Sequence, residues 1–439
     1  MDKSFFNKSM KIAVPVALQA MLQSSFSMID QVMVGQLGKT QIAAVEIGGK
    51  PGFVFTFVMG AVATVAGIQV SQYIGKKDEK SVSVSMSLNM CVMLMIALAT
   101  TFLCLLMPTT LASVFCDDSA VITQAKGYIR LVALAYPLAG LSSILAVQVR
   151  CLDHAKYPLY ASGISAIINT ALNWIFIFGK MGVPAMGVKG AALASVISKA
   201  VELIIMGVIF KKLCKFRFDI RMDRAGYVQY LVILVPIVLN ELLWTMGQNV
   251  NTFIYGHMGT NELAGMSLTG PVQGLLIGAL SGLSQAAGIL IGKRLGEKKY
   301  EKAYNESVKL CIYGFVGSIV LSLILLSVRK FYTGFYNVGN DVRNVGAGLL
   351  FAFAILAPVK VANMILGGGI IRSGGRTKYI MIIDILGTWM VGVPLGLYTG
   401  LVLKLPIVWV YFILSQEEVV RLIISIYMFR GRKWMNTIN

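Results

Sequence analysis

The sequence predicts an all-α integral membrane protein with twelve transmembrane helices, arranged as two six-helix lobes in parallel repeat. Three observations predict this fold class: the composition, a series of long apolar stretches, and an internal repeat. Hydrophobic residues make up 56% of the 439 residues and charged residues 13%, and the mean hydropathy is +0.74. Soluble domains have about 45–50% apolar and about 25% charged residues. A chain this apolar needs lipid as the solvent for much of its surface. The same composition excludes a soluble, disordered, collagen-like or coiled-coil protein.

The apolar stretches predict the spans. A helix needs about 20 mostly apolar residues to cross a bilayer. The stretches lack the polar and apolar alternation of barrel strands, and helices satisfy the backbone without water. Twelve such stretches lie near residues 12–34, 44–74, 82–107, 124–149, 157–179, 186–210, 229–255, 262–292, 306–328, 345–369, 377–401 and 405–429.

The distribution of positive charge predicts the orientation. Lys and Arg number 39 against 20 Asp and Glu, a net charge of +19. With twelve spans, 27 of these basic residues lie on the side that holds both termini and about ten on the other, while Lys199 and Lys360 lie within spans. Cytoplasmic loops are the basic ones. We therefore expect a multi-pass plasma-membrane protein with both termini in the cytoplasm, and no nucleic-acid partner.

The N-terminal segment, the cysteines and the histidines exclude several classes of function. Lys3, Lys8 and Lys11 precede the first apolar run, which ends without a small-residue cleavage signature, so it is a retained span rather than a signal peptide. The six cysteines form no CxxC pair, and HExxH is absent. The two histidines, His154 and His257, lie on opposite predicted sides. We expect no metal site, no cofactor, no enzyme and no ATP-driven pump.

The internal repeat divides the chain. Glycines and prolines dictate turns and bends, so matched positions predict matched bends. The halves are residues 1–210 and 229–439, joined by a basic cytoplasmic linker at 211–228, and six spans in each half make the repeat parallel. The matched pairs, 221 residues apart, are Pro15 and Pro236, Gly35 and Gly256, Gly38 and Gly259, Gly67 and Gly288, Gly75 and Gly296, and Pro137 and Pro358; at a separation of 222 follow Arg150 and Arg372, Lys156 and Lys378, and Tyr157 and Tyr379.

These motifs resemble those of the multidrug and toxic compound extrusion (MATE) family. The resemblance rests on the segment IDQVMVGQLG at 29–38, on Gly75, on RSGG at 372–375 and on EEVVR at 417–421. It implies a secondary antiporter in which two six-helix lobes form a V around a central cavity. Such proteins expel small organic compounds, usually cationic, in exchange for Na⁺ or H⁺. From the resemblance we expect a monomer in the lipid bilayer, with Na⁺ or H⁺ as coupling ion.

Four residues are candidates for ion coupling. Asp30 lies in the first span, where a carboxylate is costly; it is either a functional residue or a helix-end aspartate at the membrane interface. Burial favours its neutral form, whereas Na⁺ or a cationic ligand opposes protonation, so one site would have mutually exclusive occupants. Asn169 and Asn173 share a helix face at i, i+4, either as cation ligands or as interhelical packing contacts. Glu241 is the single carboxylate of its span, either a coupling residue or a structural glutamate.

Further polar residues are candidates for the substrate cavity. Gln248 follows Glu241 by seven residues on the same side of the helix, and Asn251 is the repeat partner of Asp30; both either line the cavity or form interhelical hydrogen bonds. Lys360 lies in mid-span, where it would pair with Glu241 or Asp384 or repel cationic substrates. Asp384 begins the eleventh span near the cytoplasmic turn and is either a cavity residue or an interface residue. Two groups are predicted as structural ion pairs: Glu417 and Glu418 with Arg421, and Glu46 with Lys50 in solvent.

Other function classes stay open on the sequence alone. A flippase for lipid-linked precursors has a related two-lobed plan but would need a strongly cationic cavity. A membrane-embedded enzyme lacks the catalytic motifs named above, and a channel fits a two-lobed repeat less well than alternating access does. Ion-coupled efflux is the leading hypothesis.

Overall fold

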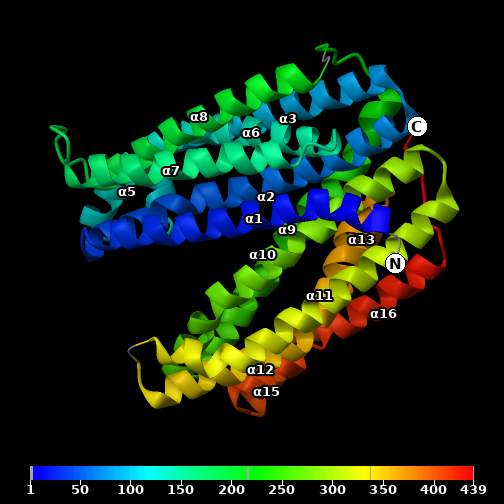
Figure 1. Cartoon of the computed structure of the whole chain (residues 1–439). Helices are drawn as coiled ribbons and strands as arrows, with labels where there is room; N and C mark the ends of the chain where they lie inside the picture. Colours follow the sequence, from blue (N-terminus) through cyan, green and yellow to red (C-terminus); the bar gives the residue numbers. More distant parts are fainter. Residues whose placement is uncertain (1–2, 215–216, 337, 439) are drawn as a thin grey trace. The chain divides into compact units, whose positions relative to one another are not determined.

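The computed structural model describes residues 3–214, 217–336 and 338–438, and every regular element among these residues is a helix (Figure 1). The chain folds into two compact units. The N-unit consists of Leu18–Val70 and Asp78–Asp223; the C-unit consists of the described residues up to Ala17, of Ser71–Lys77, and of the described residues from Arg224 onward.

The N-unit is a helical bundle. α7 and α8 lie side by side, and α6 packs against both α3 and α8 (Figure 1). Asp78 and Asp118 begin α3 and α5, because their carboxylates accept from backbone N–H groups of the first turn. The helices of the first half are α1 (Lys3–Gly35), α2 (Lys39–Lys76), α3 (Glu79–Leu106), α4 (Pro108–Ser113), α5 (Ser119–Val132), α6 (Ala135–Cys151), α7 (Lys156–Phe178) and α8 (Val188–Leu213).

The C-unit is a second bundle, in which α12 packs against both α10 and α11. Three of its segments are π-helical, with i to i+5 hydrogen bonds, a geometry that is rare and frequent at functional sites. The elements are α9 (Arg224–Met258), α10 (Thr260–Gly296), α11 (Tyr300–Gly334), α12 (Asn340–Asn363), η1 (Met364–Ile371), α13 (Thr377–Ile385), η2 (Leu386–Gly392), α14 (Val393–Leu397), η3 (Tyr398–Val402), α15 (Ile407–Leu414) and α16 (Glu417–Arg430).

Each of the twelve predicted apolar stretches is helical, but the count of unbroken spans is lower. Ten helices among the described residues are long and apolar enough to cross a membrane, and α5 with α6, bent by 44°, adds an eleventh if the pair is one span. The stretch at 405–429 is divided between α15 and α16, which a break at Ser415–Gln416 separates.

Two glycine pairs of the repeat have matched structural roles. Gly38 and Gly259 follow α1 and α9 with positive φ angles of 115° and 154°, which glycine adopts readily. Gly75 and Gly296 lie where the ends of α2 and α10 cross within the C-unit. A Cβ on Gly75 would collide with the carbonyl oxygen of Lys293, and one on Gly296 with that of Gln72. Since Gln72 and Lys293 are also repeat partners, this contact is reciprocal, as between copies related by a two-fold axis.

One proline pair does not produce matched bends. Pro137 follows the break between α5 and α6, where its ring lacks the N–H that a continuous helix needs. Pro358 lies inside α12, which continues to Asn363 and then into η1. The expectation of a matched bend is therefore wrong here. In the second half a π-helical segment follows the proline, and no separate helix begins there.

The segment after α16 packs into the C-unit. Trp434 is 1% exposed, stacks on Phe429 with ring centroids 5.5 Å apart, and donates through its indole nitrogen to the Phe429 carbonyl at 3.1 Å. Beyond it, the backbone N–H of Ile438 donates to Gln72 Oε1 at 2.7 Å, and Gln72 Nε2 donates to the carbonyl of Ser373 at 2.6 Å. This segment thus ties α2 to the turn that precedes α13.

Candidate functional site

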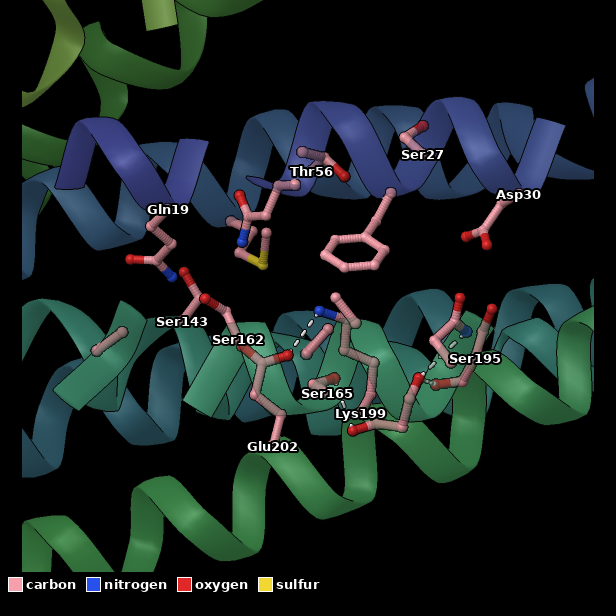
Figure 2. A pocket seen from close by; sticks show the side chains of 18 of the residues that line it. Gln19, Ser27, Asp30, Thr56, Ser143, Ser162, Ser165, Ser195, Lys199 and Glu202 are labelled. Atoms are coloured by element: carbon pink, nitrogen blue, oxygen red, sulfur yellow. Dashed lines mark hydrogen bonds and ion pairs between the residues drawn. The ribbon is translucent and has the colours of Figure 1, made fainter. Parts of the chain in front are cut away.

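The N-unit contains a polar pocket of about 500 Å³. Residues from α1, α2, α6, α7 and α8 line it (Figure 2). On α1, the lining residues Gln19, Gln23, Ser27 and Asp30 follow one face at helical spacing, because residues three or four apart are neighbours. Figure 2 shows Asp30 towards one end of the pocket and Gln19 towards the other.

Asp30 is held by the two asparagines that the sequence singles out. Asn173 Nδ2 donates to Asp30 Oδ1 at 2.7 Å and, in one amide orientation, to Asn169 Oδ1 at 3.2 Å. Asn173 and Asn169 are 2% and 9% exposed. Hydrogen bonds to an ionised carboxylate are stronger than bonds between neutral groups. The structure therefore brings three of the four predicted coupling residues together, and the expected shared helix face of the asparagines is confirmed.

The Asn169 amide has a second orientation that serves the same carboxylate. Turned by 180°, its Nδ2 donates to both oxygens of Asp30 at 3.1 and 3.0 Å, and its Oδ1 accepts from Ser198 Oγ at 3.3 Å. An ionised carboxylate only accepts hydrogen bonds, whereas a protonated one can also donate to an amide oxygen. Asn169 can therefore complement either protonation state of Asp30 by turning its amide.

The pocket contains three further charged residues that were not predicted for the site, Arg150, Lys199 and Glu202. Arg150 donates to Gln19 Oε1 at 2.6 Å, and Lys199 lies 2.7 Å from Glu202. Lys199 and Glu202 are three residues apart within the predicted span 186–210, a spacing that could have indicated an ion pair. The partnership of Arg150 with Gln19 joins residues 131 apart in the sequence, and no local pattern predicts it.

The C-unit contains a second polar pocket, of about 470 Å³. Its walls come from α9, α10, α12, η1, α13 and α16, and they include four of the predicted residues, namely Glu241, Gln248, Lys360 and Asp384. Asn251, predicted for the cavity as well, is buried and is not among these lining residues.

Glu241 lies close to a cationic side chain from another segment of the chain, which the sequence of its own span does not predict. Its carboxylate lies 3.7 Å from the guanidinium of Arg372, the repeat partner of Arg150. The preceding residue, Asn240, donates to Asp384 Oδ2 at 2.7 Å. Two neighbouring residues of α9 thus hold one charged side chain each at the pocket wall.

Arg421 is the centre of an ion network on α16. Its guanidinium lies 3.6 Å from Glu417, 3.8 Å from Glu418 and 3.7 Å from Asp384, and it also donates to the hydroxyl of Thr388. The predicted pairing of Arg421 with both glutamates is confirmed. Asp384 extends the network to α13, because Arg421 is buried and reaches across the bundle.

Lys360 has a different partner from those proposed. Its ammonium lies 3.9 Å from Glu418 and over the ring of Tyr411, 5.7 Å from the centroid. The expected pairing with Glu241 or Asp384 is wrong. Since α12 packs against α16, Glu418 at the start of α16 comes nearer than either.

Two remaining predictions concern groups outside the pockets. The solvated pair is confirmed, with Lys50 and Glu46 2.5 Å apart and both exposed.

Among the residues that the structure describes, no group of three or more His, Cys, Asp or Glu side chains is placed to hold a metal ion.

Comparison with known proteins assigns the family. The MatE family model matches residues 15–175 and 236–416, two segments that begin at the matched prolines of the repeat. The chain is similar to the uncharacterized transporter YisQ of Bacillus subtilis, with 23% identity over 99% of this chain and 96% of the relative. It is also similar to the probable multidrug resistance protein NorM of Photorhabdus laumondii, with 23% identity over 88% of this chain and 86% of the relative.

Solved structures share the fold. A mutant of the MATE transporter VcmN of Vibrio cholerae superposes with a TM-score of 0.90 at 14% identity, covering 98% of each chain. A MATE crystal structure in complex with MaL6 superposes with a TM-score of 0.89 at 16% identity, covering 97% of this chain and 95% of the other. At these identities the likeness concerns the fold, while the family model covers well over half of the chain. The protein belongs to the MatE family, the multidrug and toxic compound extrusion transporters.

Proposed function

We propose that this protein exports small organic compounds across the plasma membrane in exchange for H⁺ or Na⁺. The observation that carries the proposal is the position of Asp30, whose carboxylate lines a polar pocket and is held by Asn173. Ionisable side chains within spans are functional candidates by default, because an unused charge in hydrocarbon is costly.

In this proposal Asp30 binds the coupling ion and the substrate in turn. A proton or Na⁺ neutralises the carboxylate and removes its attraction for a cationic group, so ion binding releases substrate. The amides of Asn169 and Asn173 complete the site by donating to the ionised carboxylate or by offering oxygens to Na⁺. A ligand shifts a conformational equilibrium only if it binds the two states differently.

The C-unit pocket supplies a second place for a cation. In its network four carboxylates, those of Glu241, Asp384, Glu417 and Glu418, face the three cationic side chains of Lys360, Arg372 and Arg421. One bound proton or Na⁺ would balance these charges, and charges removed from water need such compensation. We assign this second coupling role to Glu241, whose partner Arg372 stands 3.7 Å away.

We propose alternating access as the mechanism, by rocking of residues 1–210 against residues 229–439, with both termini in the cytoplasm. Each half would carry its own polar pocket. The relatives named as multidrug resistance proteins support efflux over a lipid-linked precursor flippase. Neither pocket has more cationic than anionic side chains, which also suits a pyrophosphate poorly.

Efflux of a fluorescent organic cation from cells that express the protein tests this proposal. Asp30→Asn and Glu241→Gln each remove one negative charge with little change in shape, and both should reduce efflux at least tenfold. Glu46→Gln, which removes an exposed charge, is the matched control and should leave efflux unchanged. Full activity in both pocket variants would refute the assignment.

A further inference from the structure

Several hydroxyl groups that line the N-unit pocket donate their proton to the protein backbone and can still accept a hydrogen bond from a ligand. Four of them donate their single proton to backbone carbonyls: Thr56 to Gly52 at 2.9 Å, Ser162 to Leu159 at 3.1 Å, Ser165 to Ser198 at 2.9 Å and Ser195 to Ala191 at 3.0 Å. A hydroxyl that has donated keeps lone pairs for accepting. All of these serines are on α7 and α8, which therefore form a wall of acceptors that suits a ligand with several N–H or O–H donors.

The two ends of the pocket carry opposite charge. Asp30 lies near one end and Gln19 near the other (Figure 2), and the guanidinium of Arg150 donates to Gln19 Oε1 at 2.6 Å. Gln19 and Asp30 are eleven residues apart on α1. At 1.5 Å of rise per residue, the two ends are about 16 Å apart along the helix.

The middle of the pocket adds little net charge, and few of its lining side chains are apolar. Lys199 and Glu202 neutralise each other at 2.7 Å, with Glu202 nearly buried. The apolar lining consists of Phe26, Met59 and three alanines. Pockets for drug-sized ligands are lined predominantly by hydrophobic and aromatic side chains. A flat aromatic cation without N–H or O–H groups would make no hydrogen bond to the hydroxyl wall, so the wall would contribute little to its binding.

We propose that this pocket takes a short, hydrophilic peptide with free termini, its ammonium group at Asp30 and its carboxylate at Arg150. The backbone N–H groups of the peptide would donate to the hydroxyl wall. An extended chain covers about 3.3–3.6 Å per residue, so four to five residues span the pocket. This inference rests on the proposed transport function and specifies its substrate class.

Binding to the purified full-length protein tests the inference without a transport measurement. Tetra-alanine, its N-acetylated form and its C-terminal amide are titrated by calorimetry in detergent. We expect saturable binding of the free peptide and at least tenfold weaker binding of each capped form, because each lacks one terminal charge. Equal binding of all three forms, or no saturable binding of tetra-alanine, would overturn the inference.

Variants of Arg150 assign the carboxylate end. Arg150→Gln should weaken binding of free tetra-alanine at least tenfold and leave binding of the amide unchanged, and Arg150→Lys should restore part of the preference. A preference for the free acid that persists in Arg150→Gln would contradict the assignment. If this variant does not fold, the capped peptides on the unaltered protein still decide. If the protein does not bind the peptide but still exports a cation in a way that depends on Asp30, this inference alone is overturned. If efflux does not depend on Asp30, the proposed function is overturned.

Discussion

Asp30 and Asn173, 143 residues apart in the chain, meet in a hydrogen bond of 2.7 Å at the wall of the N-unit pocket. The bond joins α1 to α7 and fixes the carboxylate where a coupling ion and a substrate would compete for it. Asn173 is 2% exposed, so its amide is shielded from water in the folded protein.

Replacement of Asn173 by Ala should therefore impair transport. A hydrogen bond to a charged group contributes about 1.5–3 kcal/mol, and 1.4 kcal/mol corresponds to about a tenfold change. We expect the initial rate of cation efflux to fall at least tenfold. Thr170→Val is the matched control on α7, because the Thr170 hydroxyl is buried and makes no hydrogen bond among the described residues. Equal rates in the two variants would show that the bond to Asp30 has no role in transport.

Arg421→Gln should be strongly destabilising. The guanidinium faces Asp384, Glu417 and Glu418, and removing one partner of a buried ion pair costs about 3–5 kcal/mol. Thermal unfolding of the purified protein in detergent measures the loss. Arg430→Gln, at the exposed end of the same helix, should change stability by less than about 0.5 kcal/mol. Similar losses in both variants would mean that the network contributes little.

The crossing of α2 and α10 should not tolerate a methyl group. Gly75→Ala and Gly296→Ala each place a Cβ against a backbone carbonyl that has no side chain to move aside. Overpacking of this kind costs about 1–3 kcal/mol. The double variant should cost less than the sum of the two, because one separation of the helices relieves both collisions. Gly60→Ala, on α2 with open space around it, is the control and should be neutral or stabilising.

Trp434→Ala should reveal how much the C-terminal segment stabilises the C-unit. The side chain is 1% exposed, and truncation of a buried Trp costs about 3–5 kcal/mol. Trp409→Ala, at a position 59% exposed, should cost much less in the same unfolding assay. A loss no larger for Trp434 than for Trp409 would contradict the packed arrangement of this segment.

Much of the fold follows from local patterns in the sequence. Long apolar stretches give helices, and the spacing of glycines gives the repeat, because only glycine fits the crossing at Gly75 and Gly296. Where the two halves differ, the repeat fails as a guide: Pro137 follows a helix break, whereas Pro358 lies within α12. A proline restricts its own turn, and the surrounding packing decides whether the helix ends there.

The candidate site could be predicted only in part. Carboxylates and amides within spans, such as Asp30 and Asn173, could be predicted as site residues because such polar groups are unfavourable in lipid. Their partners come from other helices, and for Lys360 the sequence suggested Glu241 or Asp384 where the structure has Glu418. Tertiary packing sets such pairings. Whether a serine hydroxyl donates to the backbone depends likewise on which carbonyl it reaches in the folded protein.

Ion coupling at Asp30 is tested most directly in proteoliposomes, by measuring uptake of a fluorescent cation while Na⁺ and pH gradients are imposed separately. We expect one of the two gradients to drive uptake against the substrate gradient, and Asp30→Asn to abolish this accumulation in liposomes that contain the same amount of folded protein. Accumulation without either gradient, or full gradient-driven accumulation by Asp30→Asn, would contradict the account.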